Sequence, residues 1–175
     1  LIFSDNNGRS WHVIAVPLAA TLDIVTLDNG VLLVSGTGDG GQGFVLRSLD
    51  KGLSWETVLT VPIPVNTGRF EIIKQKATPT VTISLERDPF TPTRGYAGTN
   101  LGTVLAGEQS GKTWRTLHTL KGGAAQTFNS AETLGIRKLV ASPHKANEML
   151  LLTLNGTLIR LNGTEQTVIS IHKNL

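Results

Sequence analysis

An eight-residue segment that occurs three times constrains the fold of this chain more than any other feature. The copies are SDNNGRSW (4–11), SLDKGLSW (48–55) and GEQSGKTW (107–114), named box 1, box 2 and box 3 below. Each ends in Gly-x-Ser/Thr-Trp, and the boxes contain all three tryptophans of the 175-residue chain. A segment that recurs at this spacing predicts an array of similar structural units.

Each box lies between two short segments with the composition of β-strands. Residues 43–48 and 56–64 flank box 2, for example, and this arrangement predicts a hairpin with the box at its turn. Two further strand-like segments precede boxes 2 and 3, and a fourth unit without a box follows. Repeated units of four strands and about 44 residues are typical of β-propeller blades. We therefore predict an all-β chain of four-stranded antiparallel blades.

The predicted blades are a half blade at 1–17 and full blades at 21–64, 78–121 and 136–172, all within one domain. Residues 65–77 come nearest to a helical pattern and are predicted as a loop, a short helix or an added hairpin. Because nothing after the last unit completes the half blade, we expect an incomplete portion, about three and a half blades, of a larger propeller.

The boxes resemble the Asp-box, or BNR repeat, with the pattern Ser-x-Asp-x-Gly-x-Thr-Trp. Box 2 fits almost completely, whereas box 1 has Asn in place of Asp and box 3 has lost both the Ser and the Asp. The residues at the positions of the pattern are Ser4, Asn6, Gly8 and Trp11 in box 1, Ser48, Asp50, Gly52, Ser54 and Trp55 in box 2, and Gln109, Gly111, Thr113 and Trp114 in box 3. Propellers of sialidases, sortilin-type receptors, some glucan hydrolases and photosystem II assembly-factor-like proteins carry this repeat. The resemblance implies structural boxes at the blade periphery and does not select one function.

The physical chemistry of these residues suits a turn. A short carboxylate or amide at Asp50 or Asn6 can accept backbone N–H groups within the turn. Glycine adopts the left-handed backbone that such turns need, and the three tryptophans are expected to bury their rings against the neighbouring sheet. A calcium or ligand role for Asp50 is the less favoured alternative.

Two segments look like nucleotide sites and fail in their context. A phosphate-binding loop requires a Gly that four residues separate from Gly111, but that position is Ala106, so Lys112 is predicted as a solvated turn residue. Gly36, Gly38 and Gly41 satisfy G-x-G-x-x-G, but a strand and box 2 follow where a dinucleotide fold needs a helix. The segment 36–43 is instead predicted as a glycine-rich hairpin loop in which Asp39 could help to hold a cation.

No catalytic, cofactor or metal site is predicted. Glycoside hydrolysis needs two carboxylates that face one sugar, and although the acidic residues Asp23, Asp28, Glu86 and Asp88 could reach a central face, nothing in the sequence pairs them. Sialidases use a tyrosine with an arginine cluster, whereas Tyr96 is expected to be a buried aromatic and the arginines show no clustering. The chain has no cysteine, and its four histidines lack metal-ligand spacing and are expected to be solvated. The sequons at Asn155 and Asn162 are interpreted as hairpin turns.

Charge and hydropathy exclude two further classes of partner. The net charge is +3, but Lys and Arg are scattered, which disfavours a nucleic-acid surface. No apolar run approaches the ~18 residues of a membrane helix. The favoured hypothesis is a non-catalytic scaffold or assembly factor that binds protein partners outside the cytoplasm, with loops 36–43, 65–76 and 122–135 as contacts. The alternative is a glycan-binding or glycoside hydrolase propeller whose active site lies outside this chain or is not recognisable in it.

Overall fold

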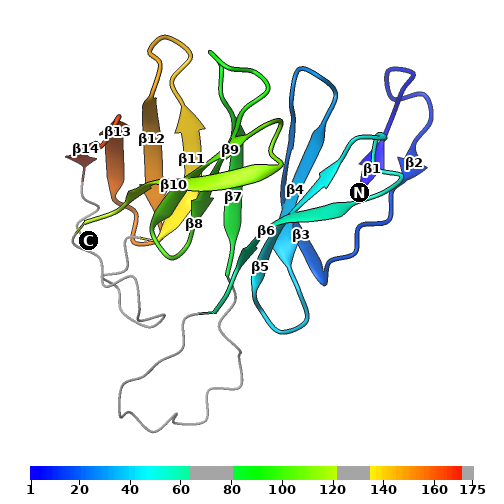
Figure 1. Cartoon of the computed structure of the whole chain (residues 1–175), viewed down its shortest axis with the longest axis horizontal. Coiled ribbons are helices and arrows are strands. Elements are labelled where there is room, and N and C mark those ends of the chain that lie inside the picture. Colours follow the sequence, from blue (N-terminus) through cyan, green and yellow to red (C-terminus); the bar gives the residue numbers. More distant parts are fainter. Residues whose placement is uncertain (64–80, 122–134, 171–175) are drawn as a thin grey trace, which may run out of the picture.

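The computed structural model describes residues 1–63, 81–121 and 135–170, and every regular element in these ranges is a β-strand (Figure 1). The all-β prediction is confirmed. Because the described residues form no helix, they include none that could cross a membrane. The segment 65–77 and the predicted contact loop 65–76 lie outside the described residues, as does nearly all of the loop 122–135.

The strands form three four-stranded antiparallel sheets and one two-stranded ribbon. Sheet 1 consists of β3 (Ala20–Thr26), β4 (Leu32–Thr37), β5 (Gly43–Ser48) and β6 (Glu56–Val61). Sheet 2 consists of β7 (Ile83–Arg87), β8 (Gly95–Thr99), β9 (Thr103–Glu108) and β10 (Thr113–Thr119). Sheet 3 consists of β11 (Ile136–Ala141), β12 (Glu148–Thr153), β13 (Leu158–Asn162) and β14 (Glu165–Ser170). The N-terminal ribbon pairs β1 (Ile2–Phe3) with β2 (His12–Val13).

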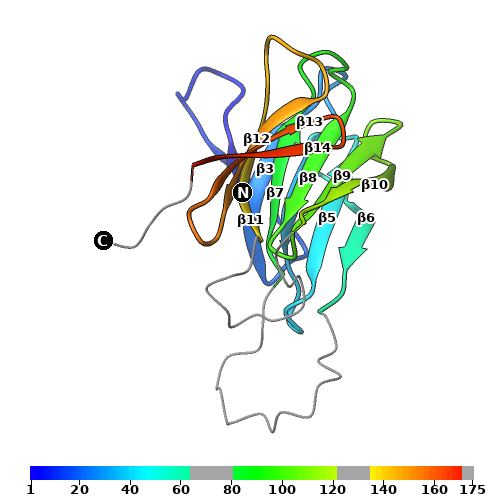
Figure 2. The same ribbon diagram turned by 90° about the vertical axis from the view of Figure 1, so that its left-hand side faces the viewer.

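Each sheet is a simple meander, in which every strand pairs with the next one in the chain. The first strand of each sheet therefore lies at one edge, and the three first strands β3, β7 and β11 lie side by side (Figures 1 and 2). We call them the inner strands. The boxes form the turns between the last two strands of sheets 1 and 2 and between the strands of the ribbon.

The core consists of two apolar layers between successive sheets. Leu33 and Val45 of sheet 1 pack in one cluster with Leu85 of sheet 2. Val104 of sheet 2 packs in a second cluster with Leu139 and other residues of sheet 3. Because successive side chains in a strand point to opposite faces, sheet 2 contributes alternate residues to both layers. Sheet-on-sheet burial thus holds the three units together.

Candidate functional site

The inner strands are joined by a repeated hydrogen bond from a backbone amide to a polar side chain. The Leu85 amide donates to Asp23 Oδ2 at 3.0 Å, and the Leu139 amide donates to Ser84 Oγ at 3.3 Å. The donor Leu85 directly follows Ser84 on β7, and the donor Leu139 directly follows Lys138 on β11. Asp23, Ser84 and Lys138 therefore occupy equivalent positions on β3, β7 and β11, and we call this the inner position.

The three side chains at the inner position meet. Lys138 Nζ lies 2.9 Å from Asp23 Oδ2, and Ser84 Oγ donates to the same oxygen at 3.4 Å. The second Asp23 oxygen accepts the Ile24 amide at 3.0 Å. The carboxylate is partly buried and paired with a cation, so its oxygens are already committed within the chain.

Two β-bulges shape a hollow of about 340 Å³ beside this cluster. The pairing of β3 shifts between Thr21 and Asp23, and that of β11 shifts between Ile136 and Lys138. Each bulge leaves one extra residue outside the regular pairing, and at β11 that residue is Arg137. The residues that line the hollow are Leu22, Asp23, Thr82, Ile83, Ser84, Arg137 and Lys138.

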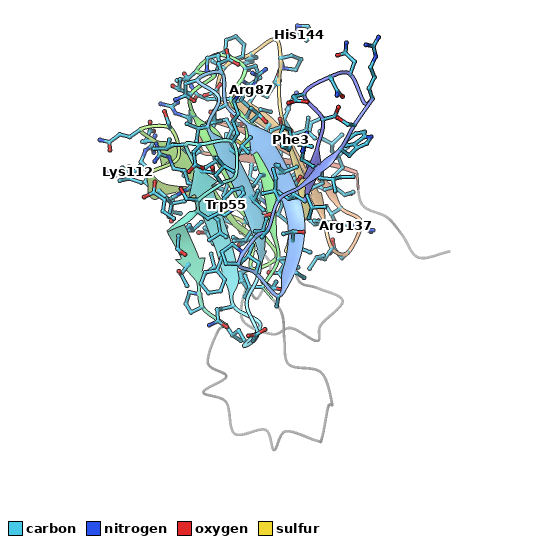
Figure 3. The ribbon with its side chains drawn as sticks, turned by 90° about the vertical axis from the view of Figure 1, so that its right-hand side faces the viewer. Phe3, Trp55, Arg87, Lys112, Arg137 and His144 are labelled. Atoms are coloured by element: carbon cyan, nitrogen blue, oxygen red, sulfur yellow. The ribbon has the colours of Figure 1, made fainter. Side chains whose placement is uncertain are left out.

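Arg137 is the group in the hollow that is available to a ligand. It is exposed, and in the described ranges no carboxylate pairs with it. Figure 3 shows it far from Lys112, which is exposed on box 3 as predicted. The lining thus combines one carboxylate with two cations, an arrangement that suits an anionic group. Among the described residues no group of three or more His, Cys, Asp or Glu side chains could hold a metal ion, and Asp39 therefore belongs to no such group.

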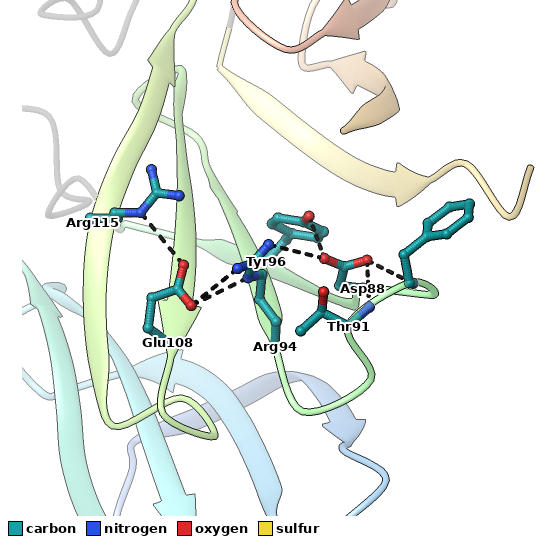
Figure 4. A network of polar contacts seen from close by, with 7 residues as sticks. Asp88, Thr91, Arg94, Tyr96, Glu108 and Arg115 are labelled. Carbon is teal, nitrogen blue, oxygen red and sulfur yellow. Dashed lines mark hydrogen bonds and ion pairs between the residues drawn. The ribbon is translucent and has the colours of Figure 1, made fainter. Parts of the chain in front are cut away.

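A second polar network lies at the turn between β7 and β8 (Figure 4). The buried Asp88 carboxylate accepts the Tyr96 hydroxyl at 2.7 Å and the Phe90 amide at 2.8 Å, and Arg94 Nη1 lies 3.4 Å away. Burial and the Asp88 hydrogen bond raise the pKa of the Tyr96 phenol to about 12. A buried phenol that already donates to a carboxylate is not a nucleophile, so this network is structural, and the prediction of a buried Tyr96 is confirmed.

Two pairings in this region were not predicted from the sequence. The arginines were expected not to cluster, but Arg94 and Arg115 flank the same carboxylate, Glu108, at 3.2 and 3.5 Å. The acidic residues do find partners, because Asp88 binds Tyr96 and Arg94, and Asp28 forms an ion pair with Arg87. The sequence signal for the contact between Asp88 and Tyr96 was their spacing of eight residues across a hairpin.

Box 2 holds its turn with its own side chains. Ser48 Oγ accepts the Gly52 amide at 2.7 Å and donates to Asp50 Oδ1 at 2.8 Å. Asp50 also accepts the Ser54 amide at 2.8 Å and the Ser54 hydroxyl at 2.5 Å. The hydrogen bonds from Ser54 and Ser48 lower the pKa of Asp50 to about 2. These bonds occupy the carboxylate within the turn, which favours the structural interpretation over a calcium site.

Box 1 repeats this geometry with an amide. Ser4 Oγ accepts the Gly8 amide at 2.7 Å, and Asn6 Oδ1 accepts the Ser10 amide at 2.9 Å. The Asn6 side-chain amide donates to Ser10 Oγ at 2.7 Å. Asparagine therefore replaces aspartate without loss of the hydrogen bonds that close the turn.

Box 3 has lost the serine and aspartate that make these bonds, and the side-chain hydrogen bond within its turn runs from Trp114 Nε1–H to the Gly111 carbonyl at 3.0 Å. Gln109, Ser110 and Gly111 all have left-handed φ angles, of +51°, +57° and +75°. The neighbouring sheet also holds the turn. Arg47 Nε donates to the Ser110 carbonyl at 2.7 Å, and the side-chain amide of Asn29 donates from Nδ2 to Ser110 Oγ at 2.6 Å.

The tryptophans differ in burial. Trp114 packs, half-buried, against the layer between sheets 1 and 2, and Trp55 is half-buried and donates Nε1–H to the Ala15 carbonyl at 3.0 Å. Trp11, however, is 60% exposed, so the prediction that all three rings are buried is wrong for box 1. Each buried ring belongs to a box that rests on the preceding unit, and the described chain places no unit before box 1.

The hairpin loop between β4 and β5 comprises residues 38–42, so the predicted loop 36–43 also includes the ends of both strands. The Val81 amide donates to the Gly41 carbonyl at 2.7 Å, and Gly36 lies so close to the Ala20 carbonyl that a Cβ would clash. Only its tip, Asp39 and Gly40, is exposed, and this tip borders a second hollow of about 570 Å³.

The histidines and sequons are placed mostly as expected. His12 and His144 are exposed, but His118 is buried with Nε2 at 3.3 Å from Gln166 Oε1, so the prediction of a solvated side chain is wrong there. The strand β14 covers it, and His172 lies outside the described residues. Asn155 and Asn162 both lie at hairpin turns of sheet 3.

Comparison with known proteins gives a fold and no family. No protein-family model matches the chain, and no curated protein matches it. Among solved structures, YCF48 from Cyanidioschyzon merolae is similar with a TM-score of 0.59 and 14% identity, over 91% of this chain and 43% of that chain. The GH74 enzyme of Niastella koreensis gives 0.60 and 17% identity, over 96% and 21%. YCF48 bound to D1 peptide gives 0.53 and 15% identity, over 91% and 46%.

These similar structures are β-propellers, and their likeness covers 91% and 96% of this chain for the first two. The fold is a β-propeller. Sheets 1, 2 and 3 are its blades, and the chain spans less than half the length of each solved chain named above. Identities below 25% show the fold alone, so the similarity does not choose between a binding protein and a glycoside hydrolase.

Proposed function

We propose that this chain is a non-catalytic Asp-box β-propeller that binds a protein partner and serves as a scaffold or assembly factor outside the cytoplasm. The composition of the hollow beside the inner strands carries the proposal. Its carboxylate, Asp23, is paired with Lys138, while Arg137 is exposed beside it with no described partner. A site of this kind binds an anionic group and lacks the free carboxylate that acid–base chemistry needs.

The partner that fits this site is an acidic protein segment. The guanidinium of Arg137 can bind a carboxylate through two parallel hydrogen bonds, and the net charge of +3 favours the approach of an acidic chain. The binding of D1 peptide by YCF48, a protein of the same fold, supports a peptide as the ligand. The exposed tip of the loop 36–43 is a second proposed contact, since loops on a rigid scaffold often carry binding.

The alternative of a glycoside hydrolase is weaker. Retaining enzymes place two carboxyl groups about 5 Å apart and inverting enzymes about 6.5–9.5 Å apart across the sugar. Within the described lining of the hollow, Asp23 is the sole carboxylate. The similarity to a GH74 enzyme keeps glycan binding as the second hypothesis.

Binding of a fluorescent decapeptide rich in Asp and Glu tests the proposal, with the matched Asn and Gln peptide as the reference. We expect the acidic peptide alone to bind, more weakly as salt is added, and about tenfold more weakly to Arg137→Gln, which corresponds to about 1.4 kcal/mol. Lys112→Gln removes the same charge from an exposed turn and should bind as the wild type does.

Equal binding of the neutral peptide, or an equal loss in the Lys112→Gln variant, would contradict the proposed site. Release of reducing ends from a glucan or arabinan by the purified chain would replace the proposal with the glycoside hydrolase alternative.

A further inference from the structure

The two β-bulges beside the hollow bring two chemically different side chains into it. On β3 the residue outside the regular pairing is Leu22, and on β11 it is Arg137. Both side chains line the hollow of about 340 Å³. Because β-bulges re-aim side chains and are frequent next to functional sites, the two extra residues are the ones to examine as ligand contacts.

The inner strand between the two bulges has none of its own. β7 lies between β3 and β11 (Figures 1 and 2), and it pairs with β8 in unbroken register from Ile83 to Arg87. An inner strand can therefore pack between its neighbours without a bulge. Leu22 and Arg137 have no counterpart on β7, so packing of the blades does not by itself account for them.

Leu22 belongs to an apolar part of the lining. Its side chain is 47% exposed, and a single exposed leucine is ordinary on a protein surface. Ile83, however, is 2% exposed and belongs to the core layer between sheets 1 and 2, and it lines the same hollow. An apolar group that covers Leu22 would therefore extend an apolar surface that already continues into the core.

The charge of the hollow comes from the strand on the other side of β7. Lys138 of β11 is paired with Asp23, whose carboxylate also accepts the Leu85 amide. Arg137 is exposed and has no carboxylate partner among the described residues. The lining therefore has an apolar side, formed by β3 and β7, and a cationic side, formed by β11.

The size of the hollow limits what can enter it. Its volume lies near the lower end of the range for ligand pockets, roughly 300–1,000 Å³. It can accept a few side chains of a partner, whereas a helix, about 10–12 Å in diameter with its side chains, would remain outside. The chemistry of its two sides then defines which side chains fit.

We propose that the hollow recognises two groups of one acidic segment: a carboxylate held by Arg137 and an aliphatic side chain packed on Leu22 and Ile83. This inference rests on the proposed binding of an acidic partner and adds the selectivity of the site. Attraction to a positive charge alone does not distinguish one acidic segment from another. The apolar side favours segments with a Leu, Ile, Val or Met beside their Asp and Glu residues.

Three fluorescent decapeptides test the aliphatic contact. The first is rich in Asp and Glu and has one central Leu, the second has Ser in place of this Leu, and the third keeps the Leu but has Asn and Gln in place of Asp and Glu. We expect the acidic Leu peptide to bind about fivefold more tightly than the acidic Ser peptide, because binding buries its side chain. The neutral Leu peptide should bind most weakly.

Added salt should separate the two contributions. It should weaken the binding of both acidic peptides, because charge attraction is screened. The ratio of their affinities should stay near five, since burial of an aliphatic side chain does not depend on that attraction. A ratio that falls to one as salt is added would contradict the packing on Leu22.

Substitutions assign the two contacts to their residues. Leu22→Ser should bind both acidic peptides equally, with the affinity that the wild type has for the Ser peptide. Arg137→Gln should weaken both about tenfold and keep the ratio. Leu53→Ser is the matched control, because Leu53 is 89% exposed on box 2 and does not line the hollow, and it should change neither affinity. Unchanged binding of the Ser peptide by Leu22→Ser shows that this variant is folded.

The outcomes separate this inference from the proposed function. Equal binding of the two acidic peptides by the wild type, with both weakened by Arg137→Gln, would refute the aliphatic contact and leave the anionic site in place. A preference for the Leu peptide that persists in Leu22→Ser would also refute it. Failure of both acidic peptides to bind would overturn the proposed function and this inference with it.

Discussion

The turns at box 2 and box 3 have similar shapes, with left-handed backbone at Lys51 and Gly52 and at Ser110 and Gly111. Different groups hold them. Box 2 is closed from within by hydrogen bonds among its serine and aspartate side chains, while box 3 has one internal side-chain bond, from Trp114 to the Gly111 carbonyl, and two from sheet 1. Local hydrogen bonds and tertiary contacts can therefore stabilise the same turn, and loss of the first does not remove the turn when the second is present.

The largest expected effect on stability comes from removal of the Trp114 ring of box 3. Trp114→Ala should lower the free energy of unfolding by about 3 kcal/mol, because the ring packs on the core between sheets 1 and 2 and fills the space beside two glycines. Lys112→Ala, at an exposed position of the same turn, should change it by less than about 0.5 kcal/mol. Urea denaturation measures both, and equal effects would mean that the ring does not anchor the turn.

A smaller loss is expected from a methyl group where box 3 contacts sheet 1. Gly111→Ala adds a side chain at φ +75° and against Leu33, and should cost about 2–3 kcal/mol. Gly163→Ala is the matched control, since its φ is +61° and no atom lies within 4 Å, so only backbone strain of about 1 kcal/mol applies. The difference between the two melting temperatures isolates the contact with Leu33. Equal shifts would show that sheet 1 does not hold the turn.

Loss of the Arg47 side chain should weaken the turn of box 3 more than the turn of box 2. Arg47→Ala removes the hydrogen bond to the Ser110 carbonyl together with the ion pair between Arg47 Nη1 and Glu56, and should cost about 2 kcal/mol. Amide exchange should accelerate at Lys112 in box 3 and change little at Leu53 in box 2. Arg115→Ala, which breaks an exposed ion pair, should cost at most about 0.5 kcal/mol. Faster exchange in both boxes would argue against the distinction.

The smallest effect is specific to box 2 and depends on pH. The pKa of Asp50 is lowered from 3.8 to about 2 in the folded state, so the carboxylate stabilises the fold above pH 3.8, and this contribution is lost as the pH falls through about 2. Asp50→Asn cannot titrate. The difference in melting temperature between the wild type and this variant should therefore narrow as the pH is lowered from 5 to about 2. A constant difference over this range would show that the carboxylate charge plays no part.

Much of the fold could be predicted because its signals are local. Alternating apolar residues, turn glycines and the boxes placed the strands of all three sheets, and box 2 contains its own hydrogen-bond partners within seven residues. The contacts between Asp23 and Lys138 could not be predicted in this way, because 115 residues separate them. They meet only because the three inner strands lie side by side and two of them contain a bulge, which the alternation of apolar residues in the sequence does not predict.

The sequence by itself determined the four-stranded units and the turns that close them. The tertiary structure alone decided which tryptophans are covered, that Lys138 pairs with Asp23, and that Arg137 lines a hollow. The physical reason is how far apart in the chain the interacting residues lie. Hydrogen bonds within a turn depend on neighbours in the chain, whereas burial and charge pairing depend on which sheet packs against which.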